Sequence, residues 1–365
     1  MTRRKKVIIF LQGGVGGAER MSVFIGKSLN REYFDVKFVT VSKGDNGQTI
    51  KQFIPKEYEV VDLFNTNVTK LIKNIYLAIK REDPEVVFSS VYFLNNKVIP
   101  MSFMFPKVRF VIRIENYLYT FNLRKRFIMR CLYRRASAII AQTQEMKDEL
   151  VEQLHVKASK VVVFENPVDK ESIDLKVADS HNPFPNDGKK HVVAVGRFAY
   201  QKGYDLLVEA MSIIRNKEVD VDLYIVGANT GAWYNHYVAI IRDIQRLGII
   251  DSVHCVGFDN NPYQYMKYAD CFVLSSRWEG LPNVLAEALY LKIPVAAFKC
   301  IPIVERMVRN GIDGFLAEKE DVKGLADAIC KAMEIREISP VYKGASKDDY
   351  EELFKTVLTD KNDTK

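Results

Sequence analysis

Two carboxylates eight residues apart are the strongest chemical feature of the sequence. Glu279 and Glu287 lie in the segment SSRWEGLPNVLAEAL, residues 275–289. Proline is favoured at the start of a helix, so Pro282 predicts Glu279 in a loop and Glu287 on the second turn of the following helix. A carboxylate facing a ligand can accept two hydroxyl hydrogen bonds, which suits a ribose or a hexose. On spacing alone, two surface acids without a role explain the pair equally well.

Two cations five residues apart follow a candidate strand. Arg197 and Lys202 stand in VGRFAYQKG, residues 195–203. Arginine can grip phosphate oxygens with its planar fork, and lysine adds a compact charge. Together they could neutralise a diphosphate leaving group without a metal, although solvated loop charges remain the alternative.

A glycine-rich loop, GGVGGAER at residues 13–20, follows the first candidate strand. Its glycines allow a tight turn and a close approach to a ligand, and the next helix begins with free N–H groups that suit a phosphate. A dinucleotide fingerprint would place glycine or alanine at position 19. Glu19 stands there, which disfavours a nicotinamide cofactor.

Short apolar strands alternate with helical patterns on both sides of these motifs, which predicts two doubly wound parallel α/β domains facing a cleft. Ligands of such sheets bind at the carboxyl ends of the strands. The prolines and turn formers near 179–188 mark the domain boundary. We expect an N-terminal domain over 1–170, a linker over 171–190, a C-terminal domain over 191–340, and a helix in 341–365 that packs back toward the N-terminal domain. The predicted strands are 7–11, 35–41, 86–89, 108–113, 137–141, 160–164, 191–195, 221–226, 252–255, 271–274 and 294–297.

In combination, these motifs resemble glycosyltransferase family 4, a retaining family with the GT-B fold. The E-x7-E signature, the GGAE loop, the GR-x4-KG loop and a late NGIDGFL turn at 310–316 all match in order. The resemblance covers nearly the whole chain. It implies an enzyme that uses a nucleoside diphosphate sugar, with the acceptor on the side of the N-terminal domain.

The resemblance also implies roles for residues at matching positions. Arg197 and Lys202 would hold the donor diphosphate, Glu287 the ribose, and Glu279 the transferred sugar. The loops after 226 and 256 would hold the base. Further donor contacts are expected at Gly16, Gly17, Gly280, Leu281, Asn283 and Val284.

One departure from the family concerns the end of the strand near Ile114. Many members have a histidine there, and Asn116 takes its place in this chain. Asparagine can donate and accept hydrogen bonds but cannot act as a cationic acid. Either Asn116 or the neighbouring Glu115 could replace the histidine.

The composition excludes several protein classes. The 365 residues are 48% hydrophobic and 27% charged, so the chain is neither disordered nor a disulfide scaffold. Its five scattered cysteines argue against a zinc ribbon and fit a reducing compartment. The D-x-D at 220–222 opens a candidate buried strand at its amino end, so we expect no metal and no other cofactor. The apolar run 7–11 is too short for a membrane span or a signal peptide.

Charge is distributed unevenly. Residues 1–165 carry 28 Lys and Arg against 16 Asp and Glu, whereas the remainder is slightly acidic. Six cations crowd residues 124–135, where apolar residues recur at helical spacing. This pattern is typical of an amphipathic helix on an anionic membrane, and a core-docked helix with a solvated face is the alternative. Nucleic acid is disfavoured, because no aromatic platform interleaves the charges. The predicted membrane patch is Arg124, Lys125, Arg126, Arg130, Arg134 and Arg135.

The sequence therefore predicts a cytoplasmic enzyme, peripheral on the inner face of the membrane, that transfers a hexose or N-acetylhexosamine to a polysaccharide or a lipid-linked oligosaccharide. Two alternatives stay open. One is a sugar-nucleotide epimerase of the same architecture, and the other is a non-catalytic nucleotide-sugar-binding protein.

Overall fold

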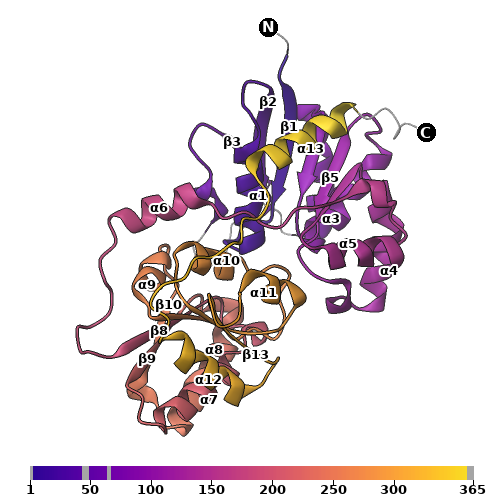
Figure 1. Cartoon of the computed structure of the whole chain (residues 1–365). Coiled ribbons are helices and arrows are strands. Elements are labelled where there is room, and N and C mark those ends of the chain that lie inside the picture. Colours follow the sequence, from indigo (N-terminus) through magenta and orange to yellow (C-terminus); the bar gives the residue numbers. More distant parts are fainter. Residues whose placement is uncertain (1–2, 43–48, 64–66, 360–365) are drawn as a thin grey trace. The chain divides into compact units, whose positions relative to one another are not determined.

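The computed structural model describes residues 3–42, 49–63 and 67–359. The chain divides into two compact units (Figure 1). Unit 1 contains Met1–Pro167 together with Gly344–Lys365, and unit 2 contains Val168–Lys343.

The first half of the expected linker 171–190 is helical. Helix α6 (Lys170–Ala178) occupies it and belongs to unit 2. The side chain of Asp169 caps this helix by accepting a hydrogen bond from the Ser172 backbone at 3.3 Å. The turn formers at 179–188 correctly indicated irregular chain, but they begin only after the helix has ended.

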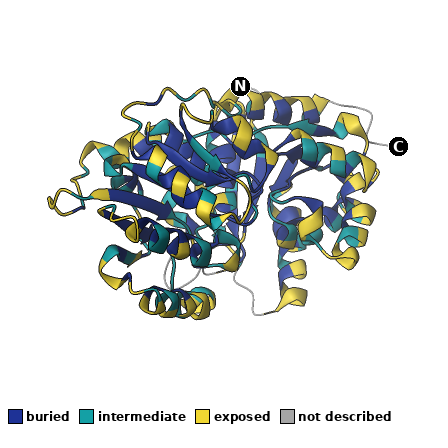
Figure 2. Ribbon diagram, turned by 60° about the horizontal axis from the view of Figure 1, so that its bottom comes forward, coloured by how far each residue is buried: buried dark blue, intermediate teal, exposed yellow. Residues whose placement is uncertain are grey.

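Unit 1 is built on a parallel sheet, which has seven strands among the described residues. Its order is β3-β2-β1-β4-β5-β6-β7, so the direction of winding reverses between β1 and β4. The strands are nearly continuous apolar runs because helices cover both faces (Figure 2). They are β1 (Lys5–Leu11), β2 (Phe34–Thr40), β3 (Glu59–Asp62), β4 (Val86–Ser89), β5 (Arg109–Arg113), β6 (Ala138–Ala141) and β7 (Val161–Val163).

The last helix of the chain, α13 (Lys347–Thr359), belongs to unit 1. Its Tyr350 and Phe354 are fully buried in the core of this unit, where they pack edge-on against Phe24 and Phe34. The other helices of unit 1 are α1 (Gly17–Ser28), α2 (Val68–Glu82), α3 (Tyr92–Val98), α4 (Leu123–Leu132) and α5 (Gln144–Glu152), with 3-10 turns η1 (Ile50–Phe53), η2 (Ile99–Phe103), η3 (Leu118–Thr120), η4 (Tyr133–Arg135) and η5 (Ala158–Lys160).

Unit 2 repeats the design with a parallel six-stranded sheet. Its order is β10-β9-β8-β11-β12-β13, and the winding reverses between β8 and β11. The strands are β8 (Lys190–Val195), β9 (Val221–Val226), β10 (Val253–Gly257), β11 (Cys271–Leu274), β12 (Val295–Phe298) and β13 (Gly314–Ala317). Besides α6, the helices are α7 (Tyr204–Arg215), α8 (Tyr234–Arg246), α9 (Tyr263–Tyr268), α10 (Asn283–Tyr290), α11 (Pro302–Met307) and α12 (Val322–Ala332), with η6 (Tyr200–Lys202), η7 (Gly231–Trp233) and η8 (Ile250–Ser252).

Two doubly wound, Rossmann-like units confirm the predicted fold class, while the cleft between them stays a prediction. The predicted strands are present, and no end is shifted by more than two residues. Two strands were missed, β3 and β13. The sequence of β3, EVVD, has an acid at each end, and that of β13, GFLA, begins with glycine, so neither is a continuous apolar run.

Candidate functional site

The winding reversal in unit 2 brings the two strongest motifs together. Ligands of doubly wound sheets bind at such a reversal, beyond the carboxyl ends of the strands. Arg197 and Lys202 follow β8, and Glu279 follows the neighbouring β11. Two hydrogen bonds join these loops: the Ser275 hydroxyl donates to the carbonyl of Lys202 at 2.8 Å, and the Arg277 backbone donates to that of Gln201 at 2.8 Å.

Glycines permit this close packing of loops. Gly203 lies against the Ser275 carbonyl, and a Cβ atom there would come within 2.2 Å of that oxygen. Its φ of 63° is also in the left-handed region that favours glycine. Gly227, after β9, lies against the Gly196 carbonyl, which a Cβ would meet at 1.8 Å. Larger residues at these positions would push the loops apart.

Glu279 is the most firmly held carboxylate of the site. Its side chain is 7% exposed and accepts hydrogen bonds from Lys202 Nζ at 2.7 Å and from the Ser276 hydroxyl at 2.6 Å. A third bond comes from Gln201 Nε2 at 3.3 Å, and the same amide donates to the Trp278 carbonyl at 2.9 Å. Lys202 supplies the countercharge that a buried carboxylate requires. Gln201 and Ser276 were not predicted as site residues, although both lie within the segments 195–203 and 275–289.

Glu287 lies on the second turn of α10, as predicted, and is 8% exposed. The Tyr263 hydroxyl, from α9, donates a hydrogen bond to its Oε1 at 3.2 Å. This contact restricts the rotation of the carboxylate. No sequence signal links the two residues, because only the packing of α9 beside α10 joins them.

Arg197 is exposed and lies over an aromatic ring. Its guanidinium carbon is 4.7 Å from the centre of the Trp233 ring, which comes from η7 after β9. A cation over an indole face is attracted by the ring quadrupole, so Trp233 helps to define where the guanidinium lies.

The remaining predicted donor contacts fall on the same loop and helix. Gly280 and Leu281 are buried in the loop before α10, whereas Asn283 and Val284 are the first, partly exposed residues of that helix. The structure thus groups them with Glu279, and their contact with a donor stays a prediction.

Arg277 fixes the loop that carries Glu279. It is 5% exposed, donates to Asp205 Oδ1 at 2.8 Å, and donates to the Tyr200 carbonyl at 2.9 Å. Burial by itself would raise the pKa of Asp205, but hydrogen bonds and the charge of Arg277 outweigh it and lower that pKa. This ion pair, in which Arg277 is buried and Asp205 is partly exposed, anchors the loop to α7 at its first turn.

The neighbouring thiol is not a nucleophile at neutral pH. Burial raises the pKa of Cys300, which follows β12, to about 12, and the negative charge of Glu279 adds to the effect. Since the thiolate is the nucleophilic form, Cys300 stays in its inert thiol form.

The glycine loop lies at the equivalent reversal in unit 1. Gly16 is the N-cap of α1 and its carbonyl accepts from the Arg20 backbone at 3.0 Å, and Gly17 begins the helix. Glu19, which the sequence analysis did not count as a site residue, is only 6% exposed and accepts a hydrogen bond from the Gln12 backbone at 3.0 Å. Burial raises the pKa of Glu19 to about 7. By accepting the hydrogen bond from Gln12, the carboxyl group of Glu19 fixes the start of the glycine loop.

Asn116 and Glu115 follow β5, also in unit 1, and both are partly buried. Glu115 accepts a hydrogen bond from the Tyr92 backbone at 2.9 Å. Burial raises the pKa of this carboxyl group against the lowering effect of that bond. Glu115 thus holds the backbone at the start of α3, and the replacement of the family histidine by Asn116 or Glu115 stays a prediction.

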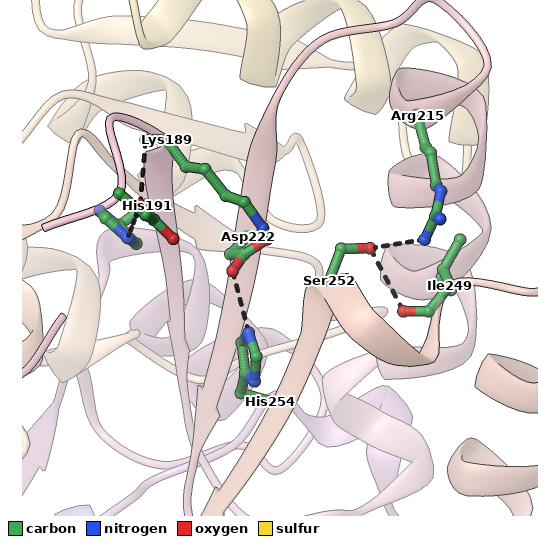
Figure 3. A network of polar contacts seen from close by, with 8 residues as sticks. Lys189, His191, Arg215, Asp222, Ile249, Ser252 and His254 are labelled. Atoms are coloured by element: carbon green, nitrogen blue, oxygen red, sulfur yellow. Dashed lines mark hydrogen bonds and ion pairs between the residues drawn. The ribbon is translucent and has the colours of Figure 1, made fainter. Parts of the chain in front are cut away.

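The second aspartate of the D-x-D segment pairs with neighbouring side chains of unit 2. Asp222, at the amino end of β9, is 3% exposed and lies between Lys189 Nζ and His254 Nε2, each at 3.1 Å (Figure 3). It therefore lies at the opposite end of the sheet from Glu279. Across the described residues, no group of three or more His, Cys, Asp or Glu side chains could hold a metal ion.

The predicted membrane patch lies on α4 and η4. Its cations are exposed except for Arg126, which is half-buried and donates to the Phe121 carbonyl at 3.0 Å. Two large apolar side chains of α4 are also exposed, Leu123 at 81% and Phe127 at 68%. Within the part of the chain that the structure describes, no helix is long and apolar enough to cross a membrane.

Two models of known protein families match this chain, one in each half. Residues 15–172 match the family model described as Glycosyltransferase Family 4. Residues 178–348 match the model described as Glycosyl transferases group 1.

Curated relatives span nearly the whole chain. One is an N-acetylgalactosamine-N,N'-diacetylbacillosaminyl-diphospho-undecaprenol 4-alpha-N-acetylgalactosaminyltransferase of Campylobacter jejuni, 26% identical with 94% of each chain covered. Another is the amylovoran biosynthesis glycosyltransferase AmsD of Erwinia amylovora, 24% identical with 86% of each covered. An uncharacterized glycosyltransferase of Haemophilus influenzae is 25% identical over 89% of each.

Solved structures share the fold. The structure of Anabaena HepE in complex with UDP and glucose superposes with a TM-score of 0.77 at 19% identity, covering 98% of this chain and 100% of that one. Apo WaaB, a lipopolysaccharide outer core galactosyltransferase, gives 0.64 at 17% identity, covering 97% and 95%.

Proposed function

The chain belongs to glycosyltransferase family 4, and from that premise we propose a retaining, metal-independent reaction. It moves a hexose or N-acetylhexosamine from a nucleoside diphosphate sugar to a growing polysaccharide or a lipid-linked glycan. The matches over both halves support transfer rather than epimerisation or simple binding.

The observation that carries the proposal is the position of Glu279. Three hydrogen-bond donors hold this carboxylate beside Lys202 at the winding reversal of unit 2. A carboxylate fixed before the ligand arrives can orient sugar hydroxyls without reorganising during the reaction. Glu287 accepts a hydrogen bond from Tyr263 and lies on the adjoining helix. We expect its carboxylate to accept hydrogen bonds from the ribose hydroxyls.

The transfer step that we propose is the retaining step that the family resemblance implies. The bond between the anomeric carbon and the diphosphate oxygen breaks, and the acceptor oxygen bonds to that carbon on the same face. The acceptor's proton passes to the departing phosphate oxygen. Arg197 and Lys202 stabilise the negative charge that develops on the diphosphate, the role that a metal has in other transferases.

The proposed classes of donor and acceptor are inferred from what related proteins bind and act on. HepE was solved with UDP and glucose, which favours a uridine nucleotide as the donor. The Campylobacter relative uses an acceptor linked to diphospho-undecaprenol, and AmsD acts in amylovoran biosynthesis. Both favour a lipid-linked or polymeric glycan as the acceptor.

We also propose that unit 1 docks peripherally on the cytoplasmic face of the inner membrane. Residues 92–135 contain ten Lys and Arg, and Glu115 is their single acid. Exposed Leu123 and Phe127 lie on the same helix as the patch. Basic and apolar side chains on one exposed surface suit the interface of an anionic bilayer.

Product analysis tests the proposed reaction. The purified chain is incubated with labelled UDP-glucose, UDP-galactose and their N-acetylhexosamine counterparts, with and without undecaprenyl-diphosphate glycan, in EDTA. An α-linked product from an α-linked donor, formed only with acceptor, is expected. An epimerised nucleotide sugar, a β-linked product, or activity that requires added Mn²⁺ would each contradict part of the proposal.

A further inference from the structure

Aromatic side chains gather at the carboxyl end of the sheet in unit 1. Tyr92 is the first residue of α3, directly after β4, and Phe121 precedes α4 in the connection that follows β5. Their ring centres are 5.1 Å apart with a tilt of 32° between the planes. Both side chains are partly exposed, so this pair is not part of the core.

A second pair comes from the same connection after β5. Tyr117 and Tyr119 stack with centres 5.5 Å apart and 23° between the planes. Tyr117 is 4% exposed and its hydroxyl forms a hydrogen bond of 3.2 Å with the Thr143 hydroxyl, whereas Tyr119 is 53% exposed. The buried ring therefore supports an exposed one.

The backbone before Tyr92 is strained. Val91 has φ 64° and ψ 138°, a conformation that a β-branched residue rarely adopts. Glu115 accepts the hydrogen bond of the next backbone N–H, that of Tyr92, and so stabilises this geometry. Strained residues persist where the surrounding structure imposes them, and they concentrate at functional sites. In this chain the strained residue Val91 directly precedes Tyr92, so its conformation fixes the backbone from which the Tyr92 side chain projects.

Two polar residues accompany these rings. Asn116 precedes Tyr117 in the chain and offers both a donor and an acceptor. Lys125 Nζ lies over the Tyr92 ring, 5.4 Å from its centre. Aromatic faces together with a few polar groups form a surface that is apolar in part and polar in part.

A pyranose ring has the complementary pattern. Its hydroxyls point outward from the rim, whereas C–H groups cover its faces. Those C–H groups are slightly positive and apolar, so they pack well on the negative face of an aromatic ring. We propose that Tyr92, Phe121 and Tyr119 form a platform that binds a sugar ring of the acceptor, with Asn116 at its edge. This inference rests on the proposed glycosyl transfer.

Binding and turnover together test the platform. Methyl glycosides of glucose, galactose, N-acetylglucosamine and N-acetylgalactosamine serve as probes, and NMR saturation transfer from the full chain reports which of their protons touch it. We expect at least one glycoside to bind wild type through the C–H protons of one ring face. Tyr92→Ala, Phe121→Ala and Tyr119→Ala should each reduce that signal.

The same variants should raise KM for a glycan acceptor by about tenfold, since each loses one stacking face. The donor KM, and the hydrolysis of donor without acceptor, should not change. Tyr92→Phe keeps the ring and loses only the hydroxyl, so it should retain the glycoside signal, which would assign the contact to the face of the ring. Tyr33→Ala is the matched control, because Tyr33 is 40% exposed on unit 1 but precedes β2 at the other end of the sheet.

The outcomes separate the platform from the proposed reaction. Glycoside binding that the alanine variants lose, in a chain that transfers no sugar, would support the platform and contradict the reaction. The platform is overturned if no glycoside binds wild type or if the alanine variants bind as wild type does. It is also overturned if the variants lose only their affinity for anionic vesicles, because the rings would then be membrane anchors.

Discussion

The two sheets reverse their winding in the same way, yet the carboxylates at the two reversals make different contacts. In unit 2, Glu279 and Glu287 are hydrogen-bonded by the side chains of neighbouring loops and helices. In unit 1, Glu19 and Glu115 accept hydrogen bonds from backbone N–H groups of the loops themselves. We propose that the first pair faces a ligand, whereas the second pair holds the backbone of its own loops.

This difference teaches what each unit contributes. Side-chain donors fix the direction of the carboxylates in unit 2, whereas the carboxylates of unit 1 fix the course of the backbone. We therefore propose that unit 2 contributes side-chain chemistry for the donor, whereas unit 1 contributes loop shape and a surface that is basic and aromatic.

The largest effect is expected at the basic surface of unit 1. Changing Arg124, Arg130 and Arg134 together to Glu should weaken binding to anionic vesicles at least a hundredfold, since each cation near such a surface contributes about 1 kcal/mol. These positions spare Lys125 and Arg126, which contact Tyr92 and Phe121. Sedimentation with vesicles measures the change, and raised salt should act in the same direction.

A matched control carries the same change of charge on another helix of unit 1. Lys70, Lys73 and Lys80 are exposed on α2, and their change to Glu should have a smaller effect. Equal losses in both variants would show that net charge, and not the surface of α4, governs binding.

Glu19→Gln tests whether the carboxylates of unit 1 are structural. Burial raises the pKa of Glu19 from 4.5 to about 7, so the folded chain keeps a proton that the unfolded chain releases between these pH values. The free energy of unfolding must therefore fall as pH rises through this window. The variant should be more stable than wild type at pH 8, by up to roughly 3 kcal/mol, and similar at pH 5.

Thermal unfolding of the full chain at the two pH values measures this difference. Glu32→Gln, at an exposed position of the same unit, is the control. If the stability of Glu19→Gln changed with pH as that of wild type does, the Glu19 carboxyl group would not be the source of the pH dependence.

Lys202→Ala tests the chemistry of unit 2. Loss of a charge-assisted contact costs roughly 1.5–3 kcal/mol, so turnover at saturating donor should fall about ten- to a hundredfold. Because Lys202 and Glu279 touch, the double variant with Glu279→Gln should lose less than the two single losses combined. Lys217→Ala, at an exposed ion pair with Asp327, should leave turnover unchanged. Wild-type turnover in Lys202→Ala would end the diphosphate assignment.

The smallest effect is expected at Trp233. Removal of an exposed cation–π contact costs about 0.5–1 kcal/mol, so Trp233→Ala should raise the donor KM about two- to fivefold. In a chain that already carries Arg197→Ala, the same change should have no further effect, because Trp233 acts through Arg197. Independent, additive effects would show that Trp233 contacts the donor itself. Tyr234→Ala, at the next and exposed position, is the control.

Much of the fold was predictable because buried parallel strands are apolar throughout and leave a clear periodic signal. The positions of Glu279 and Glu287 on loop and helix also followed from Pro282 alone. The short edge strands, β3 and β13, left no such signal.

The sequence by itself determined which residue types stand beyond the carboxyl ends of the strands, since motif spacing and strand periodicity are local properties. The tertiary structure decided which of these residues come into contact with one another. Gln201 became a partner of Glu279 because strand order places the loops after β8 and β11 side by side. Tyr263 became a partner of Glu287 because α9 packs beside α10. Glu115, a candidate for chemistry in the sequence, also accepts a hydrogen bond from the backbone of Tyr92, which is 23 residues away along the chain. A side chain's role depends on which donors surround it, and chain packing alone sets those neighbours.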